Sequence, residues 1–204
     1  MMARALGLAA FPLLIGMLSG CAGSPPVHFY QLSAEVAAGG SGPATVGTEL
    51  RIAVGPISLP EVVDRPQLVV RSGPNQVTLI DEHRWAESLK GEIPRVIADN
   101  LSRLLATGQV WAYPQNVSGL FDYRVLVDIQ RFESIPGQMA AIDALWTIQR
   151  PSKEGVVSKT GRSSVQQPMA GKGYDALVAA HSRGLAEISR EIAEAIRSFS
   201  PPSP

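Results

Sequence analysis

Two long stretches in which apolar and polar residues alternate constrain the fold more than any other feature of this sequence. The first is "FDYRVLVDIQRFES" (121–134) and the second is "MAAIDALWTIQ" (139–149). In each, four successive alternate positions are apolar or aromatic: Tyr123, Val125, Val127 and Ile129 in the first, and Ile142, Ala144, Trp146 and Ile148 in the second. A period of two is the pattern of a half-buried β-strand. The short link "SIPGQ" predicts that the two strands form an antiparallel pair, with "VVSKTGRSSVQQ" (156–167) as a polar edge strand beside them.

Two other stretches have the period of an amphipathic helix. The first contains Ile93 to Leu105, and we expect Pro94 within its first turn and Gly108 at its end. The second is expected from about Tyr174 to Phe199. The apolar stripes that define them consist of Ile93, Ile97, Leu101, Leu104 and Leu105 in the first helix and Leu177, Leu185, Ile188, Ile192, Ile196 and Phe199 in the second.

Shorter apolar runs before the first helix predict further strands. "RIAVGPISL" (51–59) alternates and then turns, "QLVVRSGPNQVTLI" (67–80) has the form of a hairpin, and "VHFYQL" (27–32) is rich in strand-forming residues. The order is then three strands, a helix, three strands and a helix, after an N-terminal strand. We predict an α+β fold with a mainly antiparallel sheet and both amphipathic helices packed on one face.

The N-terminus has the features of a lipoprotein signal. One positive charge precedes an uncharged apolar run of 14 residues, "ALGLAAFPLLIGML", which is too short for a membrane span. "LSGC" follows, and it resembles the bacterial lipobox, in which the cysteine is lipidated. Cys21 is the only cysteine, so we predict that it carries a covalent lipid, with palmitate among its acyl chains. The alternative is an ordinary secretory signal with a coincidental cysteine.

These features divide the chain into segments. Residues 1–20 are predicted as the signal peptide and 21–26 as a lipidated tether. A single domain follows at 27–200, with a flexible Gly/Ser-rich loop at about 37–47, and 201–204 form a disordered tail. Ala22 follows the cysteine, whereas Asp is the usual inner-membrane retention residue at this position in enteric bacteria. The resemblance to a lipobox therefore points to the outer membrane, facing the periplasm. If the strand at 27–32 joins the fold, six tether residues hold the domain within about 20 Å of the lipid.

Composition and motifs exclude several classes of function. Lys+Arg and Asp+Glu are both 18, so there is no basic excess of the kind that nucleic-acid binders carry. A single cysteine excludes a disulfide framework and a Cys-rich zinc site. The three histidines are far apart, so we predict no metal site, and without a nucleophile motif or a cofactor loop we predict no catalytic residues, no cofactor and no enzyme.

Two groups of titratable residues allow a second interpretation. His181 lies on the apolar stripe of the C-terminal helix, and a packed or interface histidine is favoured over a catalytic one. The cluster from Asp81 to Glu87 could supply acid–base groups, but it lies at a predicted strand-to-helix junction, where a solvated mixture of charges is common.

Several motifs together resemble one protein family. They are Gly55-Pro56, Leu59-Pro60, "DRPQ" (64–67), "RSGPN" (71–75) and "RWAE" (84–87), followed by "DYRVLVDIQRFE" and "YDALVAAHSRGLAEISREIA". In this order and spacing the sequence is similar to the ABC-type transport auxiliary lipoproteins, also called the PqiC (paraquat-inducible protein C) or YmbA family. The resemblance runs from Cys21 almost to the C-terminus.

The resemblance implies a partner and a location. It implies an outer-membrane lipoprotein, anchored by lipid and facing the periplasm, that serves an MCE-domain transport system moving lipids between the two membranes. The chain would dock the MCE-domain protein of an inner-membrane ABC-type transporter at the outer membrane, and a homo-oligomeric ring is a form of assembly that the family suggests. Two alternatives stay open, a lipid-binding carrier with its own pocket and an envelope assembly lipoprotein.

The candidate contact residues for that partner are concentrated in "LPEVVDRPQLV" (59–69). Two prolines restrict its backbone, so little conformational entropy is lost on docking. Asp64, Arg65 and Gln67 offer polar specificity beside Leu59, and Trp85 is a candidate anchor. The alternatives are a rigid loop in which Asp64 and Arg65 fix a turn, and a core position for Trp85.

Overall fold

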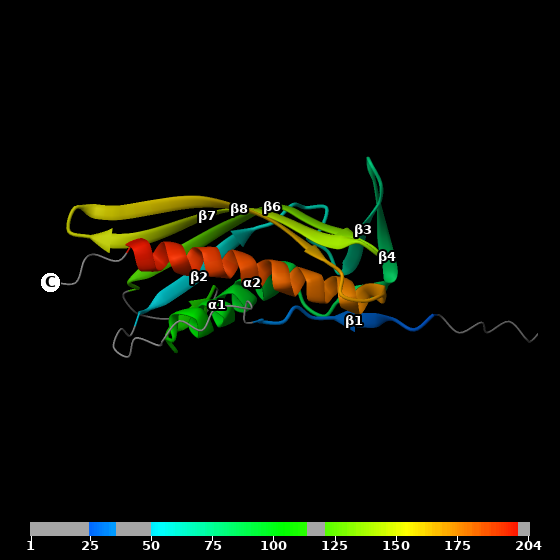
Figure 1. The fold of residues 1–204 in the computed structure, drawn as a ribbon, viewed down its shortest axis with the longest axis horizontal. Coiled ribbons are helices and arrows are strands. Elements are labelled where there is room, and N and C mark those ends of the chain that lie inside the picture. The colour runs from blue at the N-terminus through cyan, green and yellow to red at the C-terminus, as the bar shows by residue number, and fades with distance from the viewer. Residues whose placement is uncertain (1–24, 36–49, 114–120, 200–204) are drawn as a thin grey trace, which may run out of the picture.

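The structure is a computed structural model that describes residues 25–35, 50–113 and 121–199 (Figure 1). The predicted signal peptide, Cys21, the loop at 37–47 and the tail at 201–204 lie outside these ranges. The elements in chain order are β1 (His28–Tyr30), β2 (Ile52–Ser58), β3 (Gln67–Gly73), β4 (Gln76–Trp85), α1 (Leu89–Leu105), β5 (Val110–Ala112), β6 (Tyr123–Ile135), β7 (Met139–Ser152), β8 (Gly155–Pro168) and α2 (Gly173–Phe199).

All eight strands form one sheet with the order β1-β4-β3-β6-β2-β5, and β7 and β8 extend it from β6. The predicted antiparallel pair is present, because β6 pairs antiparallel with β7 and β7 with β8. The fold class is α+β as predicted, and the sheet is mainly antiparallel but mixed rather than purely antiparallel. Strand β2 runs parallel to both of its neighbours, β5 and β6, and β1 runs parallel to β4.

The parallel pairs have a topological cause. After β2 the chain makes the β3–β4 hairpin and then crosses back through α1, so that β5 starts beside the beginning of β2. Parallel neighbours need such a crossover, whereas antiparallel neighbours need only a short turn. The sequence motifs predicted the hairpins correctly but gave no signal for the crossover or for the three-residue β5.

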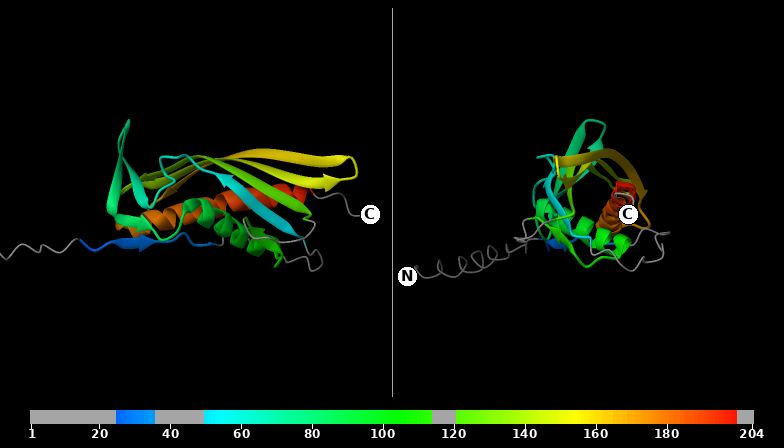
Figure 2. Two further views of the ribbon diagram at one scale, coloured as in Figure 1. Left: turned by 180° about the vertical axis from the view of Figure 1, so that it is seen from behind. Right: turned by 90° about the vertical axis from the view of Figure 1, so that its left-hand side faces the viewer.

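Both helices lie on the same side of the sheet, which curls around them (Figure 2). Helix α2 packs against β7, β8 and α1, and α1 packs against β2 and β5. The predicted stripes are buried, with Ile93, Ile97 and Leu185 fully enclosed. On β6 the alternation is also confirmed, because Val125 and Val127 are buried while the residues between the apolar positions face outward.

The ends of α1 differ from the prediction. The helix begins at Leu89, four residues before the first isoleucine of the stripe, because Leu89 continues the same buried face. Pro94 is therefore in the second turn rather than the first. The left-handed residue that ends the helix is Ala106, with φ 52° and ψ 41°, and not Gly108. No helix in the described ranges is long and apolar enough to cross a membrane.

The N-terminal segment is folded onto the two helices. Leu32 is buried in the core, and its backbone N–H donates to Glu92 Oε1 of α1 at 2.9 Å. The next N–H, of Ser33, donates to Ser182 Oγ of α2 at 3.1 Å. The segment that follows the predicted tether is therefore an integral part of the domain.

Candidate partner-docking surface

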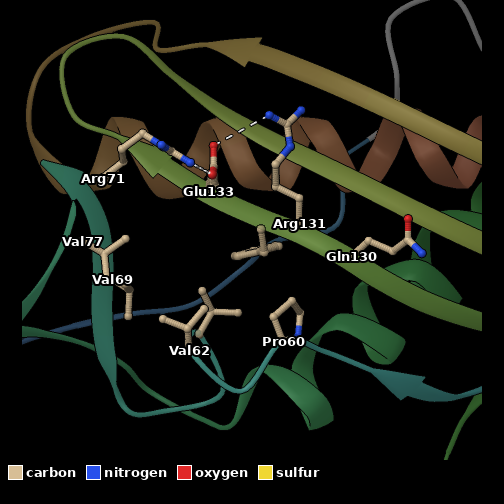
Figure 3. A pocket seen from close by; sticks show the side chains of 10 residues that line it. Pro60, Val62, Val69, Arg71, Val77, Gln130, Arg131 and Glu133 are labelled. Carbon is tan, nitrogen blue, oxygen red and sulfur yellow. Dashed lines mark hydrogen bonds and ion pairs between the residues drawn. The ribbon is translucent and has the colours of Figure 1, made fainter. Parts of the chain in front are cut away.

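A shallow apolar pocket lies where the β2–β3 loop, the β3–β4 hairpin and β6 meet (Figure 3). Its volume is about 140 Å³. The β2–β3 loop supplies Pro60, Val62 and Val63, the hairpin supplies Val69, Arg71 and Val77, and β6 supplies Gln130, Arg131, Phe132 and Glu133. We call these ten residues together with Leu79 the docking surface.

Its apolar part is exposed because of the register of the hairpin. Val69 pairs with Leu79 and Arg71 pairs with Val77, so these four side chains share one face of the two strands. Val77 is 48% exposed, Val62 44% and Leu79 40%. An exposed apolar group of this kind, when polar residues rim it, is typical of an interaction site.

Charged side chains line one rim of the pocket. Arg71 forms an ion pair with Glu133, and its Nη1 donates to the backbone oxygen of Pro74 at 2.7 Å. Arg131 bridges Glu133 and Asp143, with its Nε 2.8 Å from Asp143 Oδ2. A hydrogen bond from Ser164 and the contact with Arg131 lower the pKa of Asp143, against the effect of burial. An apolar floor with a fixed charged rim favours a protein partner over a small apolar ligand.

The structure brings three of the five predicted contact residues to the surface beside the pocket. Asp64 is partly exposed, and its Oδ2 lies 2.5 Å from Lys90 Nζ of α1. Gln67 donates from Nε2 to Asp81 Oδ1 at 3.3 Å, and Arg65 is partly exposed in the loop between them. The role of these three residues in partner binding stays a prediction.

The other two predicted residues are in the core. Leu59, a candidate contact residue, is only 8% exposed, because it follows directly after β2 and packs among the core residues. Trp85 is 5% exposed and packs edge-on against Phe132 at 6.2 Å between ring centroids. The core alternative for Trp85 is the correct one, and neither side chain is available to a partner.

Sequence reasoning missed the hairpin half of the surface. In the sequence, Val77 and Leu79 have the alternation of an ordinary strand with a buried apolar face. The same alternation occurs when that apolar face is exposed. Only the structure distinguishes the two cases, because it shows that every residue of β4 from Gln76 to Leu79 is exposed.

Of the titratable groups considered in the sequence, His181 and His83 have structural contacts. His181 is fully buried, stacks on Phe132 at 4.0 Å and shares a hydrogen bond of 2.8 Å with Ser134, so the packed interpretation is confirmed. Burial lowers the pKa of His181 to about 3. His83 Nδ1 shares a 2.7 Å hydrogen bond with Tyr30 and thereby fixes β1. Among the described residues no group of three His, Cys, Asp or Glu could hold a metal ion.

Comparison with solved structures shows a shared fold. A protein described only as uncharacterized superposes with a TM-score of 0.64 at 18% identity, covering 84% of this chain and 99% of its own. Protein XCC0632 from Xanthomonas campestris, assigned to family DUF330, gives 0.59 at 18% identity, covering 85% and 100%. A PelC dodecamer from Paraburkholderia phytofirmans, covering 77% and 95% at 16% identity, gives 0.34, too low to show a shared fold.

The sequence comparisons identify the family. No curated protein matches the chain. A family model described as "ABC-type transport auxiliary lipoprotein component" matches residues 30–193, which include every element from the end of β1 to most of α2. This confirms the resemblance found in the sequence motifs, and the family consists of transport components rather than enzymes. The chain therefore belongs to the ABC-type transport auxiliary lipoprotein component family.

Proposed function

We propose that the protein is an outer-membrane lipoprotein, anchored through Cys21 and facing the periplasm, that docks the periplasm-spanning MCE-domain protein of an inner-membrane ABC-type lipid transport system. The family supplies the general role of a transport auxiliary lipoprotein. The lipobox-like "LSGC" and the following Ala22 support the anchor and its membrane.

The observation that carries the proposal is the folded N-terminal segment. Because β1 pairs with β4 from His28 onward and Leu32 and Ser33 are bound to α1 and α2, only the six residues 21–26 separate Cys21 from the folded segment. Six residues extend at most about 20 Å. A transport component held this close to the bilayer is suited to receiving a partner at the membrane surface rather than to searching the periplasm.

The docking surface supports the contact with the partner. Its exposed valines offer an apolar centre, and the ion pairs of Arg71, Glu133 and Arg131 offer a rim that can align an incoming chain. A ring of copies around the spanning protein would repeat this surface symmetrically.

The pocket at the docking surface does not support the lipid-carrier alternative. Pockets that bind small-molecule ligands usually have volumes of about 300–1,000 Å³. The pocket at the docking surface is about 140 Å³, too small for a pair of acyl chains.

Two variants test the proposal in cells. Cys21→Ala should accumulate as an unprocessed precursor and should be lost from the outer-membrane fraction. A photo-crosslinking amino acid at Val62 should capture an MCE-domain protein, whereas the same probe at Val156, which is 65% exposed on the β7–β8 hairpin, should not. Normal maturation of Cys21→Ala contradicts the anchor, and equal capture from both positions contradicts the docking surface.

A further inference from the structure

We propose that one face of β1, formed by Val27 and Phe29 with Arg84 of β4 beside them, lies directly on the phospholipid surface. We call these three residues the membrane face. This inference rests on the proposed lipid anchor at Cys21 and adds to it a defined orientation of the domain.

The apolar part of the membrane face, Val27 and Phe29, is exposed at the surface of the domain. Phe29 is 66% exposed, which is the highest exposure among the large exposed hydrophobic residues of the described chain, and Val27 is 42% exposed. Side chains two positions apart on an extended chain point to the same side. Val27 and Phe29 are therefore neighbours on one face of the segment.

The opposite face of the same segment is occupied. The His28 and His83 rings stack with their centroids 5.1 Å apart, and Tyr30 Oη lies 2.7 Å from His83 Nδ1. His83 also contacts Tyr174 of α2, at 4.1 Å between ring centroids. These contacts determine which way the segment faces, so Phe29 cannot turn inward without breaking them.

Arg84 adds a cation to this face. It is the register partner of Phe29 in the parallel β1–β4 pair, so both side chains lie on the same side of the sheet. Its Nε donates to the backbone oxygen of Asp81 at 2.8 Å, and among the described residues it makes no ion pair. A guanidinium group beside an exposed aromatic ring can bind a lipid phosphate while the ring enters the headgroup region.

The occupant is identified by the chain that leads to this face. Pro25 and Pro26 are exposed and stiffen the last part of the tether, which connects a lipidated Cys21 to Val27 over six residues. The bilayer is therefore always within about 20 Å of Val27. Because the tether gives the bilayer a high effective concentration at the membrane face, a weak contact is enough to keep the two together.

Acidic neighbours determine the kind of contact. Glu82 is exposed two positions before Arg84, and Asp81 precedes it, so two acidic residues accompany the cation in β4. The contact therefore depends on the apolar pair more than on attraction to anionic lipid, and high salt should leave it in place.

A single-thiol experiment on the lipidated full-length protein tests the membrane face. Lipidation consumes the only cysteine, so Phe29→Cys provides a single free thiol for an environment-sensitive fluorophore. The matched control is Val156→Cys, because Val156 is 65% exposed and belongs to the β7–β8 hairpin, whose turn lies at the opposite end of the long axis from β1 (Figure 1). Both are reconstituted into phosphatidylethanolamine–phosphatidylglycerol vesicles that contain a phospholipid with a nitroxide quencher in its headgroup region.

We expect lipid nitroxide to quench the probe at position 29 at least threefold more than the probe at position 156, in low salt and in 1 M NaCl alike. Equal quenching at both positions, in protein that floats with the vesicles, overturns the membrane face but leaves the anchor intact. A position-29 probe that is shielded from aqueous iodide and also from lipid nitroxide shows that a second copy covers this face, and it overturns the proposal as well. Protein that does not float and labels at Cys21 contradicts the anchor itself.

Discussion

Glu92 is a carboxyl group enclosed where the N-terminal segment crosses α1. The side chain is 1% exposed, Oε1 accepts the N–H of Leu32, and Oε2 has no hydrogen-bond partner among the described residues. Burial raises the pKa of Glu92 to about 7, although the Leu32 N–H and the charge of Arg95 act in the opposite direction. The protonated form is therefore the one that suits the folded protein at acidic and near-neutral pH.

The first prediction concerns pH. A carboxyl group with a raised pKa in the folded state stabilises the protein below the pKa of the unfolded chain and loses this advantage as the pH rises to about 7. Glu92→Gln keeps an acceptor for Leu32 and does not titrate. Between pH 5.5 and pH 8, the free energy of unfolding should fall by about 2 kcal/mol more in the wild type than in Glu92→Gln.

Urea denaturation of both proteins at the two pH values measures this difference. His181 has a lowered pKa and therefore acts in the opposite direction, since its stabilisation is lost as the pH falls below the unfolded value. Both proteins keep His181, so the comparison isolates Glu92. Identical pH profiles would show that the carboxyl group is already ionised in the folded state.

At the scale of the element, the contact between β7 and β8 includes a tryptophan of β7 whose ring packs over a glycine of β8. Trp146 is the register partner of Gly161, and its Nε1 donates to Ser163 Oγ at 3.0 Å. A Cβ on Gly161 would lie 2.1 Å from Trp146 Cζ2. The indole thus occupies the space that a side chain on the neighbouring strand would need, and the hairpin depends on a glycine at this position.

The second prediction follows from that contact. Gly161→Ala should lower the free energy of unfolding by about 1–3 kcal/mol, because the indole must leave its rotamer or the strands must separate. Gly91→Ala is the matched control, since a Cβ there meets nothing within 4 Å and the residue is inside α1. The control should instead gain roughly 0.5–1 kcal/mol. Loss of stability in both variants, by thermal or chemical denaturation, would contradict the proposed cause.

The elements differ in how far they could be predicted from the sequence. The strands β6 and β7 and both helices were predictable because their patterns extend over ten or more residues and each pattern reports burial on one face. Strand β5 has only three residues, which is too few to show a pattern. The alternation in β2 is the same whether its neighbouring strands are parallel or antiparallel to it. For the docking surface, the sequence indicated only the loop segment 59–69, and none of the five candidate contact residues lines the pocket itself. An apolar alternation does not say whether another layer covers it, so the parts from β4 and β6 could not be predicted.

At the scale of the whole molecule, the tether sets where the domain can be. We expect the docking surface to engage its partner only while the domain is held close to the membrane. An insertion of 20 Gly/Ser residues between Pro26 and Val27 lengthens the free chain from six residues to 26. The effective concentration at the membrane should then fall by about tenfold.

The third prediction is that this insertion reduces the crosslink from Val62 to the MCE-domain protein by a similar factor, while processing and membrane fractionation remain normal. The same insertion after Gly40, within the predicted flexible loop, is the control and should leave the crosslink unchanged. Quantitative crosslinking in cells that express each variant at equal levels provides the measurement. An undiminished crosslink from the long tether would show that distance plays no part.

The docked N-terminal segment also determines when the fold can be completed. In an exported lipoprotein this segment reaches the periplasm first, but the contact between Ser33 and Ser182 spans 149 residues and that between Leu32 and Glu92 spans 60. Contacts between residues so distant in sequence form late, after the local helices and hairpins. With the proposed lipid anchor, β1 is thus the first strand to arrive and among the last to dock, and until then it does not cover the junction of α1 and α2.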